Sequence, residues 1–292
     1  MPGALPRLPV VSTLEDAIRA TGWNLLRFLP IYLLVWIATF ATTPLLRDFW
    51  INELGWRVMP VWVLYMKDAP LTAMYCAVFL RLGILGINPS RTASVWDGTV
   101  ARVAVVLAVW FASWALLDGL YLLAYRGLLD WTRPTLNEPG GWTYGSQAAL
   151  YFWGGWFVRL LKLGAVTCIY GQAAIIVVHG RFDWREHLAL LRADPVRLGL
   201  IVLAAAVVTD GLELFWQRVL PFLPTVAPVT VTNTTHWPEA LLPTLLRSFR
   251  LFPSHFLADV FGAMLLSGVY LRLTRPAKNP SIPLSSAGSI AI

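Results

Sequence analysis

Six long apolar runs, separated by shorter polar segments, dominate the pattern of the chain. The runs occupy residues 24–46, 69–87, 100–126, 149–178, 197–217 and 251–271. A helix needs roughly 20 predominantly apolar residues to cross the hydrocarbon core of a bilayer, and the runs are of about this length or longer. The pattern predicts an all-α fold: a polytopic integral membrane protein with six transmembrane helices.

Polar segments with a common local pattern precede the first, third and fifth runs. Ser12–Glu15, Ser94–Asp97 and Asp183–Glu186 each place an oxygen-bearing side chain three residues before an acidic one, as in a helix capping box. The pattern predicts three membrane hairpins, introduced by short amphipathic interfacial helices. They form a single six-helix membrane domain over residues 1–275. Residues 276–292, rich in Pro and Ser, are expected to be a tail without a packed core.

The connections on the other side of the predicted bundle are rich in Pro, Gly and Trp. They cover residues 47–68, 127–148 and 218–250. The first is expected to carry an interfacial helix with Trp56, Met59 and Val63 towards lipid, and the last regains helical character at Glu239–Leu246. Tryptophan is enriched where a membrane meets water, so these residues are interpreted as interfacial anchors.

Composition supports a membrane location and excludes a nucleic-acid-binding function. The chain is 57% hydrophobic and 13% charged, whereas soluble domains carry about 25% charged residues. The net charge of +7 comes from single basic residues at the ends of apolar runs, with more of them on the flanks that share a side with the termini. The positive-inside rule then places both termini in the cytoplasm. Arginine far outnumbers lysine, which suggests a GC-rich bacterium, so we expect a multi-pass protein of a bacterial inner membrane.

Two segments carry a family resemblance. The run Asp183–Arg192 before the fifth span resembles the linker helices of the YciC-like group, which is related to the membrane domain of some bacterial glycerophosphodiesterases. Val269–Arg272 resembles the end of that domain. The resemblance covers about residues 12–275, and it implies a non-catalytic membrane module with no catalytic residues to carry over.

One motif suggests an enzyme, but its surroundings argue against that function. Asp97–Arg102 matches the core motif of the CDP-alcohol phosphatidyltransferases. Those enzymes need further carboxylates to hold metal ions, and here Ser94, Ala115 and Gly119 stand at those positions, with Phe111 in place of a motif glycine. Hard cations require several oxygen ligands. We therefore expect no catalytic residues, no metal site and no cofactor.

The histidines give no sign of a haem or catalytic site. Arg185, Glu186 and His187 are expected to form the polar face of a helix. Only His255 lies near the interior of a span, which argues against ligation of haem by two histidines.

Ionisable residues inside the apolar runs form the only candidate functional site. Arg159 and Lys162 are three residues apart, as are Asp210 and Glu213, so each pair shares a helix face. Asp118, His255 and Asp259 are predicted to join them in the outer half of one bundle, with Arg159 paired to Asp210 or Asp259. Such charges either fix the register of helices or line a ligand pathway, and the sequence leaves both interpretations open.

Two functions remain open. The first is a non-catalytic accessory or scaffold subunit of a membrane assembly, whose partners are the lipid bilayer and other proteins. The second is a transporter or lipid-handling protein that uses the charged outer cavity. A scaffold should tolerate neutral residues at Asp210 and Asp259, whereas a carrier should lose transport.

Overall fold

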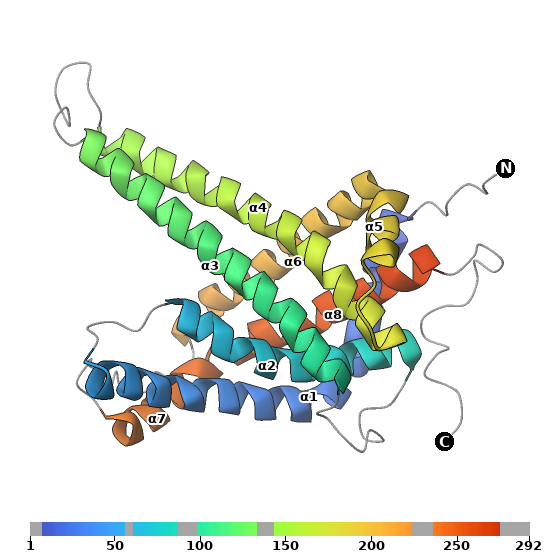
Figure 1. The fold of residues 1–292 in the computed structure, drawn as a ribbon, viewed down its shortest axis with the longest axis horizontal. Helices are drawn as coiled ribbons and strands as arrows, with labels where there is room; N and C mark the ends of the chain where they lie inside the picture. The colour runs from blue at the N-terminus through green and yellow to red at the C-terminus, as the bar shows by residue number, and fades with distance from the viewer. Residues whose placement is uncertain (1–7, 56–60, 87–97, 133–142, 223–235, 275–292) are drawn as a thin grey trace.

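The computed structural model describes residues 8–55, 61–86, 98–132, 143–222 and 236–274 (Figure 1). Of these residues, 93% are helical and none lies in a strand. The long helices are α1 (Val10–Asp48), α2 (Val61–Leu80), α3 (Gly98–Thr132), α4 (Tyr144–His179), α6 (Pro195–Val219) and α8 (Phe252–Thr274), and the short ones are α5 (Trp184–Ala193) and α7 (Trp237–Phe249). Single π turns extend α1 (η1, Phe49–Glu53) and α2 (η2, Arg81–Leu85), and a 3₁₀ turn extends α6 (η5, Leu220–Phe222).

Five helices of the described chain are long and apolar enough to cross a membrane. They are Val10–Glu53, Met66–Leu85, Gly98–Thr132, Pro195–Val219 and Phe252–Thr274. The all-α prediction is therefore confirmed, and so is the coarse prediction of several apolar helices of membrane-spanning length. The remaining predicted span, 149–178, lies within the 36-residue helix α4, which is not among the five.

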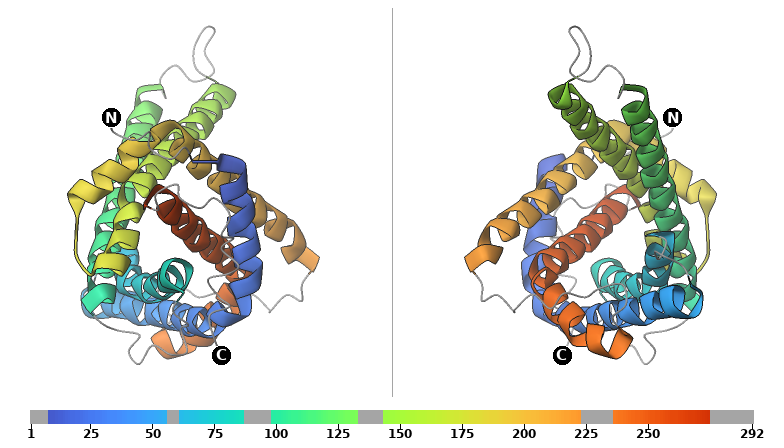
Figure 2. Two further views of the ribbon diagram at one scale, coloured as in Figure 1. Left: turned by 90° about the vertical axis from the view of Figure 1, so that its right-hand side faces the viewer. Right: turned by 90° about the vertical axis from the view of Figure 1, so that its left-hand side faces the viewer.

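Helix α8 occupies the centre of the arrangement (Figure 2). It contacts α1, α2, α4, α5, α6 and α7, and most of its residues between Phe256 and Tyr270 are buried. Two groups of buried side chains flank it. One joins Phe28 and Phe79 to Val260, and the other joins Ile201 to Phe261. Asp259, in the middle of α8, lies beside these buried side chains and is itself half-buried.

Helices α3 and α4 form a long antiparallel pair that projects beyond the other helices (Figure 1). The Tyr121 hydroxyl donates to the carbonyl of Tyr151 at 2.6 Å, and the amide of Gln147 donates to the Thr132 hydroxyl at 2.6 Å. A Cβ atom on Gly154 would lie 3.0 Å from the Tyr121 ring, so glycine permits this close contact. These bonds satisfy polar groups that would be costly to expose to lipid.

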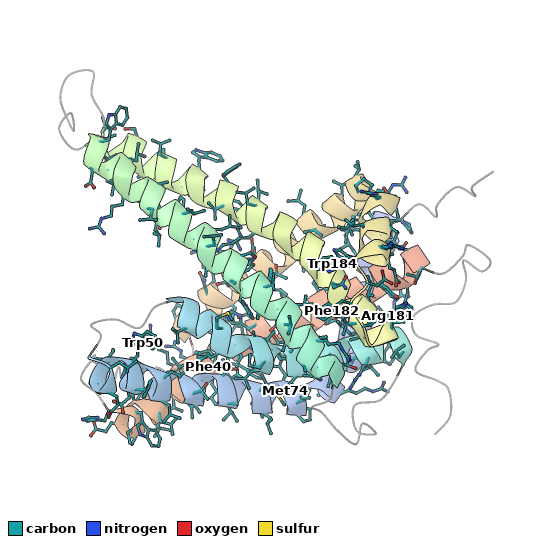
Figure 3. The ribbon with its side chains drawn as sticks, viewed as in Figure 1. Phe40, Trp50, Met74, Arg181, Phe182 and Trp184 are labelled. Carbon is teal, nitrogen blue, oxygen red and sulfur yellow. The ribbon has the colours of Figure 1, made fainter. Side chains whose placement is uncertain are left out.

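The three predicted interfacial helices agree with the structure to different extents. Helix α5 is a separate amphipathic helix, and the Asp183 side chain caps it by accepting bonds from the backbone N–H groups of Arg185 and Glu186, both at 3.0 Å. Phe182 and Trp184 flank this cap (Figure 3). The two backbone donors hold the pKa of Asp183 below its usual range. The segment Ser94–Asp97 lies outside the described residues.

The capping box predicted at Ser12 is wrong. Helix α1 begins earlier, with Pro9 at its N-cap, and runs without interruption for 39 residues. The Ser12 and Thr13 hydroxyls donate back to the Pro9 carbonyl, so these residues already lie inside the helix. At 1.5 Å per residue α1 is about 58 Å long, so its amphipathic start continues directly into the apolar segment.

The predicted outer helices are also partly described. Helix α7 covers the expected Glu239–Leu246 and extends it at both ends. Of the interfacial helix expected within 47–68, Val63 lies in α2, whereas Trp56 and Met59 lie outside the described residues.

The most extensive helix contacts follow only the second of the three predicted hairpins, the pair α3–α4. The contacts between α2 and α3 and between α1 and α8 exceed those within the other two predicted hairpins, α1–α2 and α6–α8. Arg272 near the end of α8 pairs with Asp16 in α1 and also donates to the Ser12 hydroxyl at 2.9 Å. These contacts stabilise the packing of α8 against α1. The arrangement in three hairpins stays a prediction.

One close approach depends on glycine. In η2, a Cβ atom on Gly83 would lie 2.7 Å from Cβ of Ser267 and 3.0 Å from Cε of Met264, both in α8. The π turn thus packs directly against the central helix. Gly86 then ends the element with φ of 70°, a conformation that favours glycine.

Candidate functional site

A cavity of about 730 Å³ lies among the long helices and receives most of the charged residues predicted to form a site. Its lining includes Asp118 from α3, Arg159 and Lys162 from α4, Glu213 from α6, and His255 and Asp259 from α8. Asp210 is not part of the lining, but it pairs with Arg159. Ionisable side chains from four different helices thus lie around one cavity.

The two basic residues of α4 each pair with a different helix. Lys162 Nζ lies 2.5 Å from Asp118 Oδ1, which joins α4 to α3, and Arg159 pairs with Asp210, which joins α4 to α6. The sequence predicted either Asp210 or Asp259 as the partner of Arg159, and in the structure the partner is Asp210. The Lys162 side chain is 15% exposed and the Arg159 side chain 47%, so the basic group of the first pair is the more desolvated one, whereas Asp118 is slightly more exposed than Asp210.

Aromatic rings accompany both basic residues. Lys162 Nζ lies 4.8 Å from the ring centroid of Trp114, and the Arg159 guanidinium lies 5.7 Å from that of Trp156. Cations at these distances are attracted to the negative face of the ring. The ammonium of Lys162 is therefore held by an indole face and a carboxylate together.

Asp259 accepts hydrogen bonds from hydroxyl groups and does not pair with a described Lys or Arg. Its Oδ2 atom accepts hydrogen bonds from the Tyr32 hydroxyl at 2.7 Å and from the Tyr75 hydroxyl at 3.0 Å. The two tyrosine rings contact each other edge to face at 4.9 Å. His255 lies one turn before Asp259, with its ring 5.6 Å from that of Trp36. Within the described residues, no Lys or Arg pairs with Asp259.

Glu213 and Asp68 complete the acidic lining. Glu213 is exposed at the cavity and accepts a hydrogen bond from Gln217 at 3.3 Å, and no basic side chain in the described part of the chain pairs with it. Asp68 pairs with its neighbour Lys67, which also donates to the Thr39 carbonyl at 3.0 Å. Two carboxylates of the cavity, Asp259 and Glu213, therefore pair with no Lys or Arg of the described residues.

Sequence reasoning missed part of this lining. Tyr32 and Tyr75 were included in apolar runs, and Asp68 was left in a loop because the second run was drawn from residue 69. The cavity wall also includes Trp36 and Trp114. A hydroxyl in the middle of an apolar run is the signal that identifies the tyrosines, since a buried tyrosine hydroxyl usually finds a hydrogen-bond partner.

A second cavity of about 360 Å³ adjoins the first and is mainly apolar. Side chains of α5, α6 and α8 form most of its wall, and it shares Trp110, Trp114 and Asp259 with the charged cavity. Asp259 and the two indole rings therefore stand at the boundary between the charged cavity and the apolar cavity.

His187 lies in the wall of the apolar cavity, which corrects the expectation of a polar helix face. It is only 2% exposed, and a Cβ atom on Gly171 would lie 3.1 Å from its ring. Its neighbour Glu186 accepts a hydrogen bond from the Tyr270 hydroxyl at 3.0 Å. Because α5 contacts α4 and α8, its His187 faces protein and its Glu186 is half-buried, whereas Arg185 stays exposed as expected.

The residues of the charged cavity do not form a recognisable reaction centre. Among the described residues, no group of three or more His, Cys, Asp or Glu side chains is placed to hold a metal ion. The arrangement can bind and orient charged groups, and it can exclude lipid from them. Asp97 of the phosphatidyltransferase-like motif lies outside the described residues.

Searches against family models, characterised proteins and solved structures found no match to the chain. The resemblance to the YciC-like group stays a prediction. Fold and site together define a class: an all-helical protein with several helices of membrane-spanning length around a charged internal cavity.

Proposed function

We propose that this chain is a non-catalytic, multi-pass protein of a bacterial inner membrane that binds a ligand in the charged cavity, as a transporter or a lipid-handling protein does. The observation that supports this proposal is the convergence of Asp118, Arg159, Lys162, Glu213, His255 and Asp259 on one hollow of about 730 Å³. Ionisable groups at membrane depth are costly, and they commonly mark substrate or ion pathways.

A six-span topology with both termini in the cytoplasm is part of this proposal. Helix α4 is 36 residues long, about 54 Å, and contacts α3 along the projecting pair. If α4 crosses the membrane like α3, successive long helices alternate in direction. The distribution of basic residues then places α5 on the cytoplasmic side and α7 on the outer side.

A purely structural role explains less of the geometry. Ion pairs such as Lys162–Asp118 can fix the register of two helices, and that function needs only the paired groups. It requires neither a cavity beside them nor carboxylates such as Glu213 and Asp259, which pair with no Lys or Arg in the part of the chain that the structure describes. A ligand that enters the cavity accounts for both features.

Blocking the cavity tests the proposal. Val158 lines it, so Val158→Trp should fill part of the space, whereas Val109 is 58% exposed on α3 and serves as a matched site for Val109→Trp. Each protein is purified in nanodiscs, and bound small molecules are identified by mass spectrometry. We expect a compound that is enriched at least about tenfold with the wild type and Val109→Trp over Val158→Trp. Equal recovery from all three proteins would contradict the proposal.

Neutralising single carboxylates provides a second test. Asp259→Asn and Asp210→Asn remove charge with little change in shape. A ligand-binding protein should lose the compound in at least one of these variants while it keeps its thermal stability within a few degrees. A scaffold should keep both its assembly and any bound compound.

One observation favours an accessory subunit as the second candidate. The α3–α4 pair extends beyond the bundle and exposes large apolar side chains, among them Leu123, Trp153 and Phe157. Lipid can cover this surface, and so can the helix of a partner protein. Proteins that co-purify in mild detergent with the wild type and with Trp153→Ala are compared to decide between lipid and a partner protein. A specific partner should be lost from the variant.

A further inference from the structure

We propose that the ligand is an organic cation with an apolar tail, with its ammonium group in the charged cavity near Asp259 and Glu213 and its tail in the adjoining apolar cavity. This inference rests on the proposed function and adds the chemical class of the ligand to it.

The charge of the cavity argues for a cation. Three carboxylates around it already have basic partners, in the pairs Asp68–Lys67, Asp118–Lys162 and Asp210–Arg159. Neither Asp259 nor Glu213 pairs with a Lys or Arg among the described residues, and the further basic group in this lining is His255, one turn before Asp259. Asp259 is half-buried and Glu213 is exposed, so the cost of shielding a carboxylate from water without a positive charge applies mainly to Asp259. A bound cation would supply that charge.

The aromatic wall argues for an organic cation over a metal ion. Tyr32, Trp36 and Phe40 from α1, Tyr75 from α2, and Trp110 and Trp114 from α3 all line the charged cavity. Rings of this kind attract ammonium groups through their negative faces, and clusters of them recognise quaternary ammonium compounds. A metal ion would instead require several oxygen ligands close together.

The protein already holds one ammonium group in this way. Lys162 Nζ lies against the Trp114 ring and the Asp118 carboxylate at 4.8 Å and 2.5 Å. Asp259 also lies among aromatic residues, although Tyr32 and Tyr75 contact it through their hydroxyl groups and not through their ring faces. The position that Lys162 fills beside Asp118 has no counterpart beside Asp259, and we assign this position to the ligand.

The apolar cavity argues for a tail. It contains side chains such as Ile201, Ala205 and Leu266, and its boundary with the charged cavity is formed by Trp110, Trp114 and Asp259. A head group beside Asp259 therefore lies next to a space suited to an alkyl chain. Each methylene that leaves water contributes to binding, so chain length should affect affinity.

Two buried indole groups indicate which polar groups the head of the ligand should carry. The Nε1 atoms of Trp36 and Trp114 are buried in the wall of the charged cavity, and no described residue accepts a hydrogen bond from them. Buried donors without acceptors are uncommon. A hydroxyl or ester oxygen near the ammonium group of the ligand would satisfy them.

The test uses the full chain in dodecyl maltoside and three probes: octyltrimethylammonium, octyl sulfate and tetramethylammonium. Binding is measured by isothermal titration calorimetry against micelles without protein. We expect saturable binding of octyltrimethylammonium and at least about tenfold weaker binding of the other two, because one lacks the positive charge and the other lacks the tail.

Variants separate the two halves of the site. Asp259→Asn and, independently, Glu213→Gln should weaken octyltrimethylammonium binding at least about tenfold in one or both cases. Gly262 lines the apolar cavity with no atom within 4 Å of an added Cβ, so Gly262→Phe should fill it. This variant should weaken the octyl probe at least about tenfold and leave tetramethylammonium unchanged. Gly22→Phe, where an added Cβ also meets open space in α1, is the matched control and should bind as the wild type does.

The possible failures are distinguishable. If octyl sulfate binds as well as the cation, or if both carboxylate variants bind normally, the cationic head is wrong. If Gly262→Phe has no effect, the position of the tail is wrong. In these cases a compound displaced by Val158→Trp would still support a ligand in the cavity, whereas failure of that experiment would overturn the proposed function itself.

Discussion

The Asp259 carboxylate accepts a hydrogen bond from the Tyr32 hydroxyl at 2.7 Å, although the two residues are 227 positions apart in the chain. The bond joins the central helix α8 to α1 at the wall of the charged cavity. It places a polar contact inside an otherwise aromatic cluster, where Tyr32 also contacts Phe252 and Phe256. This contact therefore contributes both to packing and to the shape of the site.

Removal of this hydroxyl should weaken the protein measurably. Tyr32→Phe leaves the ring contacts in place and deprives Asp259 of one donor, so we expect a loss of about 1 kcal/mol in unfolding free energy. Tyr125→Phe in α3 is the control, since Tyr125 packs on Tyr121 and Tyr151 away from Asp259. Steric-trapping or thermal unfolding in detergent measures the difference. Equal stability of Tyr32→Phe and wild type would show that the bond contributes nothing.

The two ion pairs of α4 should differ in strength. The Lys162 side chain is far less exposed than that of Arg159, although Asp118 is somewhat more exposed than Asp210, so water screens the first pair less at its basic member. A double-mutant cycle with Lys162→Met and Asp118→Leu should give a coupling of about 1–3 kcal/mol, and the double variant should recover most of the stability lost in either single one. The same cycle on Arg159 and Asp210 should give a smaller value. A larger coupling for that pair would contradict this ranking.

A methyl group on Gly83 should disturb the contact between η2 and α8. The added Cβ meets Ser267 Cβ at 2.7 Å, so Gly83→Ala should destabilise the protein by about 1–3 kcal/mol through overpacking. Gly22→Ala adds the same group where nothing lies within 4 Å, and it should be neutral or slightly stabilising because alanine favours helix. Thermal unfolding of the two variants side by side provides the measurement.

Loss of the Asp183 cap should loosen α5. The pKa of this carboxyl group is lower in the folded protein than in the unfolded chain, so its contribution to stability is present above the unfolded pKa and declines as the pH falls through the folded pKa. We expect faster hydrogen exchange in the first turn of α5 in Asp183→Ala at neutral pH, with Asp183→Asn closer to wild type because asparagine also caps helices. Unchanged exchange in Asp183→Ala would contradict this role.

Cysteine accessibility tests whether α4 crosses the membrane. Arg181 follows α4 with a side chain that is 74% exposed, and Ala148 lies exposed near its start. In a background with Cys76→Ala and Cys168→Ala, Ala148→Cys should react with an impermeant maleimide in intact cells. Arg181→Cys should react only after permeabilisation. Labelling of both from the same side would exclude the six-span topology.

The helices were predictable because the membrane imposes a simple rule. Within hydrocarbon the backbone must satisfy its own hydrogen bonds, so long apolar runs become helices, and each predicted run overlaps a long helix of the structure. Their ends were harder to place. The pair Lys67–Asp68 lowered the local hydropathy and delayed the predicted start of α2, although the two charges pair with each other in the structure.

For the candidate site, the sequence predicted which charged residues share a helix face, but not which residues they pair with. The spacing of Arg159 and Lys162 required one helix face, but their partners depend on how α3, α4 and α6 rotate about their axes. That rotation is decided by packing across the whole bundle, which no single segment encodes. For the same reason Tyr32 and Tyr75 could not be connected to Asp259, and the apolar cavity beside it had no counterpart in the sequence pattern.

The central position of α8 has a consequence for biosynthesis. During translation α1, α2, α4 and α6 are made before the helix that all of them contact. Until α8 inserts, Arg272 cannot hold the start of α1, and the tyrosines that bind Asp259 lack their acceptor. The final assembly step is therefore the arrival of the last described helix, and nascent chains interrupted before residue 252 should be favoured substrates for membrane quality-control proteases.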